Sequence, residues 1–139
     1  MTQYSEILLR LIFATVAGGL IGLEREVVHK PAGVRTHMLV CLGSALFMII
    51  AIDSIAPEAF ADATSRIIAG VVTGVGFLGA GTIFKSKVEV HGLTTAASIW
   101  AVAAVGLAIG LGYYFISIVS VVLVLIVLQL NKLEFFKNL

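Results

Sequence analysis

Ionisable side chains that could perform chemistry gather at two places in this sequence. One group lies in and around the segment LEREVVHKPAGVRTH, and the other consists of Glu6, Arg10, Asp53 and Arg66. Carboxylates and imidazoles can ligate metals or act as general acids and bases. No nucleophile stands beside a base, however, and the three histidines lack a metal-binding spacing. The residues therefore predict no enzyme, no cofactor and no metal site.

Composition decides the environment of these side chains. The chain has 139 residues, of which 60% are hydrophobic and 12% are charged, whereas about 25% are charged in a typical soluble domain. A soluble domain of this size would leave large apolar patches on its surface. A membrane protein is therefore expected, with lipid as a partner. The net charge of +1 gives no reason to expect a nucleic-acid partner.

The N-terminal segment and the single cysteine narrow the class further. The segment MTQYSEILLR lacks the basic region and the cleavage site of a secretory signal peptide, so the first hydrophobic segment is expected to remain in the protein. One cysteine, Cys41, excludes a disulfide within the chain. We expect Cys41 to be a small, buried apolar residue.

Four hydrophobic stretches must position the ionisable groups. They span residues 7–23, 36–56, 67–84 and 93–130, and a membrane helix needs about 20 predominantly apolar residues. The last stretch is about twice that length, so two helices that fold back at Gly110, Leu111 and Gly112 are predicted. One long, tilted or kinked helix is the alternative. The expected fold is an all-α, polytopic transmembrane bundle of five helices, forming a single domain over residues 1–139.

Lysine and arginine positions predict the orientation, because short basic loops stay in the cytoplasm. With five helices and the N-terminus outside, seven of the nine basic residues lie inside. These seven are Arg25, Lys30, Arg35, Lys85, Lys87, Lys132 and Lys137. The other two, Arg10 and Arg66, fall towards the outside. The C-terminus is therefore predicted to lie inside.

Small residues at four-residue spacing predict where helices approach closely, because they let two backbones come together in lipid. The first stretch carries such a ridge at Ala14, Gly18 and Gly22. The third stretch contains five glycines, which are Gly70, Gly74, Gly76, Gly79 and Gly81. Each interior glycine costs about 1 kcal/mol of helix propensity relative to alanine, so a central, tightly packed third helix is favoured. The alternative is that its segment FLGAGTIF is irregular and lines a cavity.

A further ridge of small residues lies in the fourth helix, at Ala104, Ala108 and Gly112. Together these ridges offer more packing surface than one small bundle needs, so a homo-oligomer is predicted, with a dimer as its simplest form. The fifth helix is rich in Val, Leu and Ile and is expected to face lipid.

Ionic clusters are expected at both ends of the bundle. Asp53 lies about 17 residues into its stretch, or ~26 Å at 1.5 Å per residue, which is near the outer interface. Arg66 opens the next helix on that side, so a pair between Asp53 and Arg66 is predicted, either as structure or as a functional site. Arg10 should face protein and pair with Glu6. At the inner end two carboxylates flank Arg25, and they could set helix register or receive a partner's basic group.

Several long motifs, in order along the chain, resemble those of a known family. They are GGLIGLERE, KPAGVRTHMLVCLGSALF, RIIAGVVTGVGFLGAGTIF and VHGLTTAASIWAVAAVGLAIGLGYY. Together they resemble the membrane domain of the MgtC/SapB family. The resemblance implies a bacterial inner-membrane protein linked to adaptation to low magnesium and, in pathogens, to virulence through survival inside host cells. Members commonly carry a cytoplasmic domain after the last helix; this chain stops at Leu139, so no such domain is expected.

The ionic clusters and the motifs that carry the resemblance together give the candidate functional residues. They are Glu24, Arg25, Glu26, Arg35, Thr36, His37, Asp53, Arg66, Thr82, Thr94 and Thr95. Two functions compete. One is a regulatory module that binds other membrane proteins, or its own copy; the other is a transporter of magnesium or another cation. Magnesium needs hard oxygen ligands and no acidic residue is predicted near mid-membrane, so the regulatory module is favoured.

Overall fold

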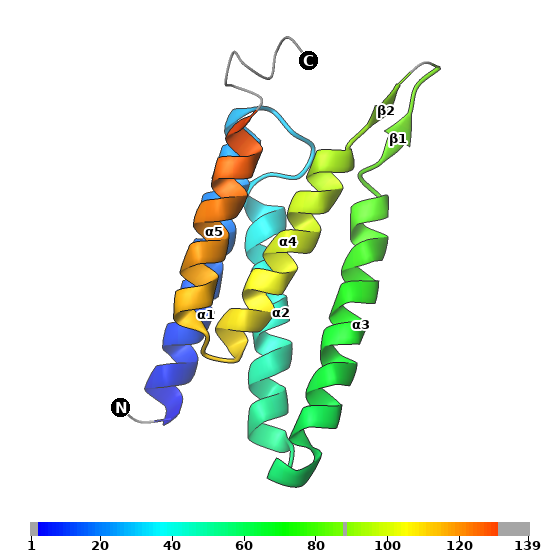
Figure 1. Ribbon diagram of the computed structural model, residues 1–139. Helices are drawn as coiled ribbons and strands as arrows, with labels where there is room; N and C mark the ends of the chain where they lie inside the picture. The colour runs from blue at the N-terminus through cyan, green and yellow to red at the C-terminus, as the bar shows by residue number, and fades with distance from the viewer. Residues whose placement is uncertain (1–2, 88, 131–139) are drawn as a thin grey trace.

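The computed structural model describes residues 3–87 and 89–130. Five α-helices stand side by side in one bundle (Figure 1). They are α1 (Gln3–Val27), α2 (Val34–Ser54), α3 (Phe60–Ala80), α4 (Leu93–Gly110) and α5 (Tyr114–Gln129). A 3₁₀-helix, η1 (Pro57–Ala59), precedes α3, and a small antiparallel hairpin of β1 (Phe84–Lys85) and β2 (Val90–His91) precedes α4. The all-α class is confirmed, and the hairpin is an addition that the sequence did not predict.

The helices have the lengths and composition that a bilayer requires. Four segments are each long and apolar enough to cross a membrane: Gln3–Val27, Val34–Ser54, Pro57–Ala80 and Leu93–Gly110. Helix α5 is a shorter apolar helix of 16 residues. The last hydrophobic stretch divides at Gly110–Gly112 as predicted. Gly112 has a φ of 83°, which a residue with a side chain rarely adopts and which turns the chain back into α5.

The start of α3 is a correction to the predicted boundary. The hydrophobic stretch begins at residue 67, but the helix begins at Phe60. Ala56 is extended because it precedes Pro57, and Pro57 opens η1, which leads directly into α3. Asp62 in the first turn of α3 favours a helix start there, since an acidic side chain complements the helix dipole.

The chain alternates between two ends of the bundle (Figure 1). We call one the hairpin end; it holds the loop from α1 to α2, the β-hairpin and the start of α4. The other, the Asp53 end, holds the start of α1, the end of α2 and η1. Five basic residues lie in segments of the hairpin end: Arg25, Lys30, Arg35, Lys85 and Lys87. Lys132 and Lys137, which the sequence places on the same side, lie outside the described residues.

Helix α4 is the centre of the bundle and packs against α1, α2, α3 and α5. Of the 18 residues of α4, 56% are buried inside the protein, against 17% of the most apolar part of the segment Pro57–Ala80, which contains α3. The main hydrophobic core joins side chains of α1, α2, α4 and α5 around Ile21, Cys41, Val102 and Ile109. Cys41 is fully buried, as expected, and α5 leaves most of its side chains exposed, as expected of a helix that faces lipid.

Glycines let α2 lie against α1 on one side and against α4 on the other. A Cβ added at Gly18 would stand 2.5 Å from the carbonyl oxygen of His37, and one at Gly22 would stand 2.6 Å from the Cα of Val34. A Cβ at Gly106 would stand 2.2 Å from the carbonyl oxygen of Cys41. The predicted ridge of Ala14, Gly18 and Gly22 is therefore used within the chain.

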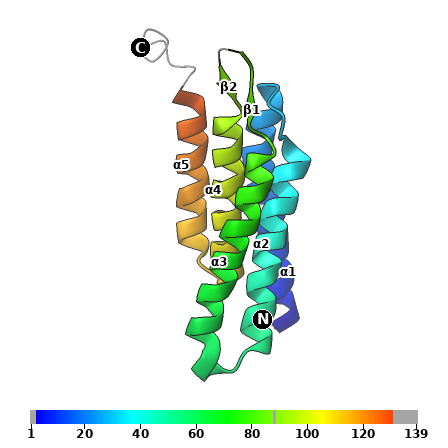
Figure 2. The same cartoon turned by 90° about the vertical axis from the view of Figure 1, so that its right-hand side faces the viewer.

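The prediction that α3 is central and tightly packed is wrong. Figure 2 shows α3 on an outer face of the bundle, and only Val75 and Gly79 are buried among its residues. A Cβ added at Gly70, Gly74 or Gly76 would meet no atom within 4 Å. The alternative was that the segment FLGAGTIF, residues 77–84, is irregular. Its first four residues are helical instead, because α3 continues to Ala80 and Gly81 is its C-cap. Glycine content alone did not show which helix the others surround.

Candidate functional site

A buried ion pair lies where α1 ends, at the hairpin end. Arg25 Nη2 is 2.5 Å from Glu24 Oε2, and the two side chains are 4% and 7% exposed. Glu24 Oε1 is buried without a hydrogen-bond partner among the described residues. A charge removed from water is costly unless it is paired, so each side chain of this pair depends on the other.

Glu26, the second carboxylate beside Arg25, ties α1 to the start of α2. Its Oε2 accepts a hydrogen bond from the backbone N–H of Val34 at 2.9 Å. That N–H belongs to the first turn of α2, where backbone donors have no partner within the helix. This bond joins the end of α1 to the first residue of α2.

His37 continues this polar network from α2 into α4. Its Nδ1 is 2.9 Å from the carbonyl oxygen of Gly33, and its Nε2 is 3.0 Å from Ser98 Oγ. A carbonyl only accepts, so Nδ1 carries the proton. Ser98 Oγ also lies 2.8 Å from the carbonyl oxygen of Thr95, so a neutral His37 shares one hydroxyl proton with that carbonyl.

The His37–Ser98 contact has the geometry of a base beside a hydroxyl nucleophile, but it is closed to substrates. His37 is 0% exposed and Ser98 is 2% exposed. The group that orients the imidazole is a backbone carbonyl, whereas a catalytic base is usually oriented by a carboxylate. This hydrogen bond therefore has a structural role, because it joins the start of α2 to the first turns of α4.

A second polar cluster lies at the Asp53 end. Arg10 Nη1 donates to the carbonyl oxygen of Gly110 at 2.7 Å, and Arg10 also forms the expected ion pair with Glu6. Gln3 Nε2 donates to Asp53 Oδ1 at 2.5 Å. These groups line a small cavity of about 180 Å³ between α1 and α2. Arg10 therefore faces protein as predicted, and it satisfies a carbonyl at the end of α4.

The predicted pair between Asp53 and Arg66 is wrong. Arg66 Nη2 lies 3.0 Å from Asp62 Oδ2 on its own helix, and these side chains are 79% and 73% exposed. A partner one turn away on the same helix face is always within reach, whereas a partner on α2 must be brought there by packing. Arg66 thus stands apart from the cluster that holds Asp53.

The remaining candidate residues have separate places. Arg35, Thr36 and Thr94 are exposed at the hairpin end, while Thr95 is buried beside Ser98. Thr82 Oγ1 donates to the carbonyl oxygen of Gly79 at 2.7 Å and so satisfies a carbonyl at the end of α3.

Two residues outside the candidate set, Ser98 and Gln3, complete these networks. Ser98 follows Thr95 by three residues, about one helical turn, and this spacing indicates that the two side chains lie on the same face of the helix. Gln3 offered no such signal, because its partner is 50 residues away.

No metal centre emerges from the described part of the chain. Among residues 3–87 and 89–130, no group of three or more His, Cys, Asp or Glu side chains could hold a metal ion. At the Asp53 end two carboxylates, those of Glu6 and Asp53, line one cavity, but the positive charge of Arg10 lines it too. A guanidinium in that position repels a cation, and that of Arg10 pairs with Glu6.

The helices and their connecting motifs match a known family. The family model described as "MgtC family" matches residues 11–135. The chain belongs to the MgtC family. The resemblance seen in the sequence motifs is thereby confirmed, and the match covers α2 to α5 together with α1 from residue 11 onwards.

Several curated relatives share this family's helices. "Putative magnesium transporter YhiD" of Escherichia coli K12 is 48% identical over 129 residues, which cover 90% of this chain and 60% of the relative. "Protein SrpB" of Synechococcus elongatus is 42% identical over 86% of this chain and 71% of its own length. "Protein MgtC" of Brucella abortus is 44% identical over 71% of this chain and 40% of its own. The chain thus spans about 60% of the Escherichia coli relative. No solved structure matches it.

Proposed function

We propose that this chain is a multi-pass protein of the bacterial inner membrane that acts as a regulatory module on other membrane proteins. The adaptation it serves is growth in low magnesium and, in a pathogen, survival inside host cells. Family membership supports this setting. The proposed orientation places the N-terminus outside and the C-terminus inside, because the basic residues of the hairpin end then face the cytoplasm.

One observation carries the regulatory role: α1, α2 and α4 are packed backbone to backbone. The contacts at Gly18, Gly106 and Gly110 leave no room even for a methyl group, since an added Cβ would lie 2.2 to 2.6 Å from a carbonyl oxygen of α2. A pathway for magnesium needs oxygen ligands and room for a hydrated ion. The core is built as a rigid support, and its charged groups lie at its two ends, where a partner protein can meet them.

The alternative function is a transporter of magnesium or another cation. The printed name of the Escherichia coli relative favours it, and the cavity beside Asp53 is the place where an ion could enter. In this case Asp53 would be a ligand, and its bond to Gln3 would be a resting contact.

Ion flux into liposomes that contain only the purified protein separates the two functions. We expect a trapped magnesium indicator to respond no faster than in protein-free liposomes. A flux that Asp53→Asn abolishes, and that the control variant Glu58→Gln, at an exposed carboxylate of the same end, leaves unchanged, would overturn the regulatory proposal. Circular dichroism of both variants checks that the helices are intact.

A further inference from the structure

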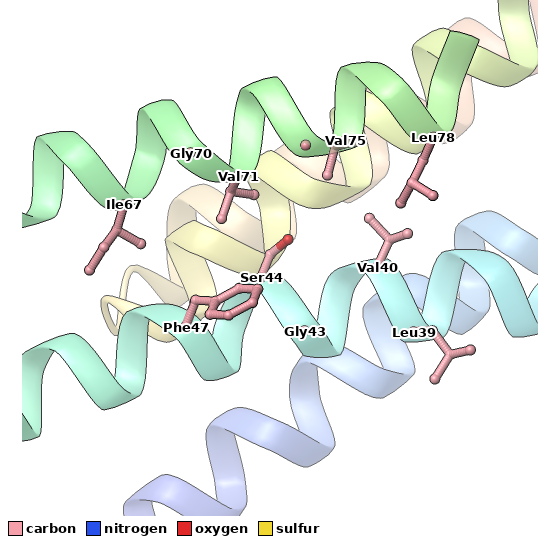
Figure 3. A pocket seen from close by; sticks show the side chains of 11 residues that line it. Leu39, Val40, Gly43, Ser44, Phe47, Ile67, Gly70, Val71, Val75 and Leu78 are labelled. Carbon is pink, nitrogen blue, oxygen red and sulfur yellow. The ribbon is translucent and has the colours of Figure 1, made fainter. Parts of the chain in front are cut away.

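An apolar groove runs between α2 and α3. It has a volume of about 640 Å³ and is lined by aliphatic side chains, Phe47, three glycines and Ser44. Figure 3 shows Phe47 and Ser44 on α2 opposite Ile67, Gly70 and Val71 on α3. The groove exists because α3 packs on α4 through Val75 and Gly79 while its Gly70–Gly74 side stays open.

Ser44 is the polar group of this groove, and its hydroxyl is unpartnered. Ser44 as a residue is 4% exposed, and its side chain makes no hydrogen bond within the described part of the chain. Other helical hydroxyls here, those of Thr15, Thr73 and Ser117, donate to the carbonyl four residues earlier. The Ser44 oxygen points instead towards α3 (Figure 3). A hydroxyl in an apolar environment is costly without an acceptor, so the occupant of the groove should supply one.

Two glycines on the opposite wall also have open space beside them within the described part of the chain. An added Cβ at Gly70 or Gly74 would meet nothing within 4 Å, unlike one at Gly18 or Gly106. Glycine weakens a helix relative to alanine, and nothing in the fold of one chain requires it at these positions. Glycines four residues apart do have a use in lipid, which is the close approach of a second helix.

The same row of α3 continues into a pair of opposite charges. Asp62, Arg66, Gly70 and Gly74 follow one another at four-residue spacing, and rows of this kind interlock when two helices cross with right-handed geometry. Asp62 and Arg66 are largely exposed and 3.0 Å apart. A second copy of the row, related by a two-fold axis, would place each Arg66 near Asp62 of the partner subunit.

We propose that a second copy of this chain occupies the groove, so that the α3 helices of two subunits cross at Gly70 and Gly74. Copies inserted in one membrane have the same orientation, so the two α3 helices are parallel, and a two-fold axis makes the contact self-complementary. The glycine row leaves backbone carbonyls of the incoming helix uncovered, which gives Ser44 its acceptor. A lipid acyl chain would fill the same volume, but it offers neither an acceptor for Ser44 nor a counterpart for Asp62 and Arg66. This interface goes beyond the proposed function and holds for a regulator or a transporter alike.

The test compares Gly74→Leu with Gly76→Leu in full-length protein. Both glycines lie on α3 in open space, but Gly76 is ~200° further around the helix at 100° per residue, so it faces away from the proposed contact. Energy transfer between donor-labelled and acceptor-labelled copies in liposomes gives the dimerisation constant. We expect Gly74→Leu to lower it about tenfold or more, a change of ~1.4 kcal/mol, and Gly76→Leu to match the wild type. Equal constants for both variants, or a wild type that is monomeric, would overturn the proposal and leave a lipid chain as the occupant.

Oxidative cross-linking guards against a misfolded leucine variant. Gly70→Cys should form a disulfide-linked dimer in membranes, whereas Gly76→Cys should not, and the natural Cys41 is too buried to compete. A mixture of Arg66→Asp copies and Asp62→Arg copies should give mostly heterodimers, because each homodimer brings like charges together. A random mixture of subunits would show that the charged end of the row is outside the interface.

Discussion

At the scale of single residues, the polar side chains inside this bundle mostly serve the backbone. Glu26 accepts from the N–H of Val34, His37 donates to the carbonyl of Gly33, and Arg10 donates to the carbonyl of Gly110. All three backbone groups lie at helix ends. The N–H of Val34 and the carbonyl of Gly110 have no partner within their own helices, whereas the carbonyl of Gly33 also accepts the backbone N–H of His37. The polar groups therefore fasten helix ends to each other, and they do so at both ends of the bundle.

The ion pair of Glu24 and Arg25 gives the sharpest prediction at this scale. Arg25→Gln leaves a buried carboxylate unpaired, so we expect it to lower the free energy of unfolding by about 3 to 5 kcal/mol. The double variant Glu24→Gln with Arg25→Gln should recover part of that loss, because neither charge remains buried. Thermal unfolding in detergent, followed by circular dichroism, measures both effects.

Arg66→Gln is the matched control for this pair. Its partner Asp62 is largely exposed, so its loss should cost under about 1 kcal/mol. Equal losses for Arg25→Gln and Arg66→Gln would contradict the assignment of the Glu24–Arg25 pair as a buried one.

At the scale of the helices, the glycines form two groups, which differ in whether another helix packs against them. Those of α1 and α4, such as Gly18 and Gly106, lie against the backbone of α2, whereas a Cβ added at Gly70, Gly74 or Gly76 of α3 would meet no atom of the described residues within 4 Å. The first group holds the core together. The second group lies where α3 has room for a larger side chain, on two different sides of the helix: Gly70 and Gly74 on one and Gly76 on another.

Alanine substitution should separate the two groups of glycines. Gly106→Ala places a Cβ 2.2 Å from the Cys41 carbonyl oxygen, so the helices must separate, and overpacking of this kind typically costs about 1 to 3 kcal/mol. Gly76→Ala meets open space and should stabilise α3 by up to about 1 kcal/mol, the propensity difference between the residues. Unfolding midpoints of the two variants should therefore move in opposite directions. A loss of stability in Gly76→Ala would mean that α3 has a close neighbour on that side.

At the scale of the whole molecule, the fold sorts charge by end. Five basic residues lie in segments of the hairpin end, while Arg10 and Arg66 lie towards the other end. Short basic loops are retained in the cytoplasm, and this charge difference is the physical basis for the orientation we propose.

Labelling of single cysteines in intact cells tests the orientation. A membrane-impermeant maleimide should modify Glu58→Cys, which lies in η1, and should reach Lys87→Cys, which lies in the hairpin, only after the cells are permeabilised. Cys41 is buried and serves as the unreactive background. The reverse accessibility would invert the topology and place the hairpin end outside.

Much of the fold could be predicted because the bilayer imposes it on the sequence. Helices are the way for an open chain to satisfy its backbone in lipid, so apolar length alone gave α1, α2, α4 and α5, and the glycines at Gly110–Gly112 marked the turn between the last two. The pair of Glu6 and Arg10 was also predictable, since four-residue spacing fixes which side chains meet on one helix.

Tertiary structure decided which helix faces meet, because spacing within one helix carries no information about its neighbours. Five glycines in the third hydrophobic stretch suggested a central helix, yet α4 holds the central place and packs Gly106 and Gly110 directly against α2. In the same way Asp53 and Arg66 share an end of the bundle but not a contact: each found a nearer partner, in Gln3 and in Asp62. Periodicity determines which residues share a face of a helix, but only tertiary packing determines which face another helix covers.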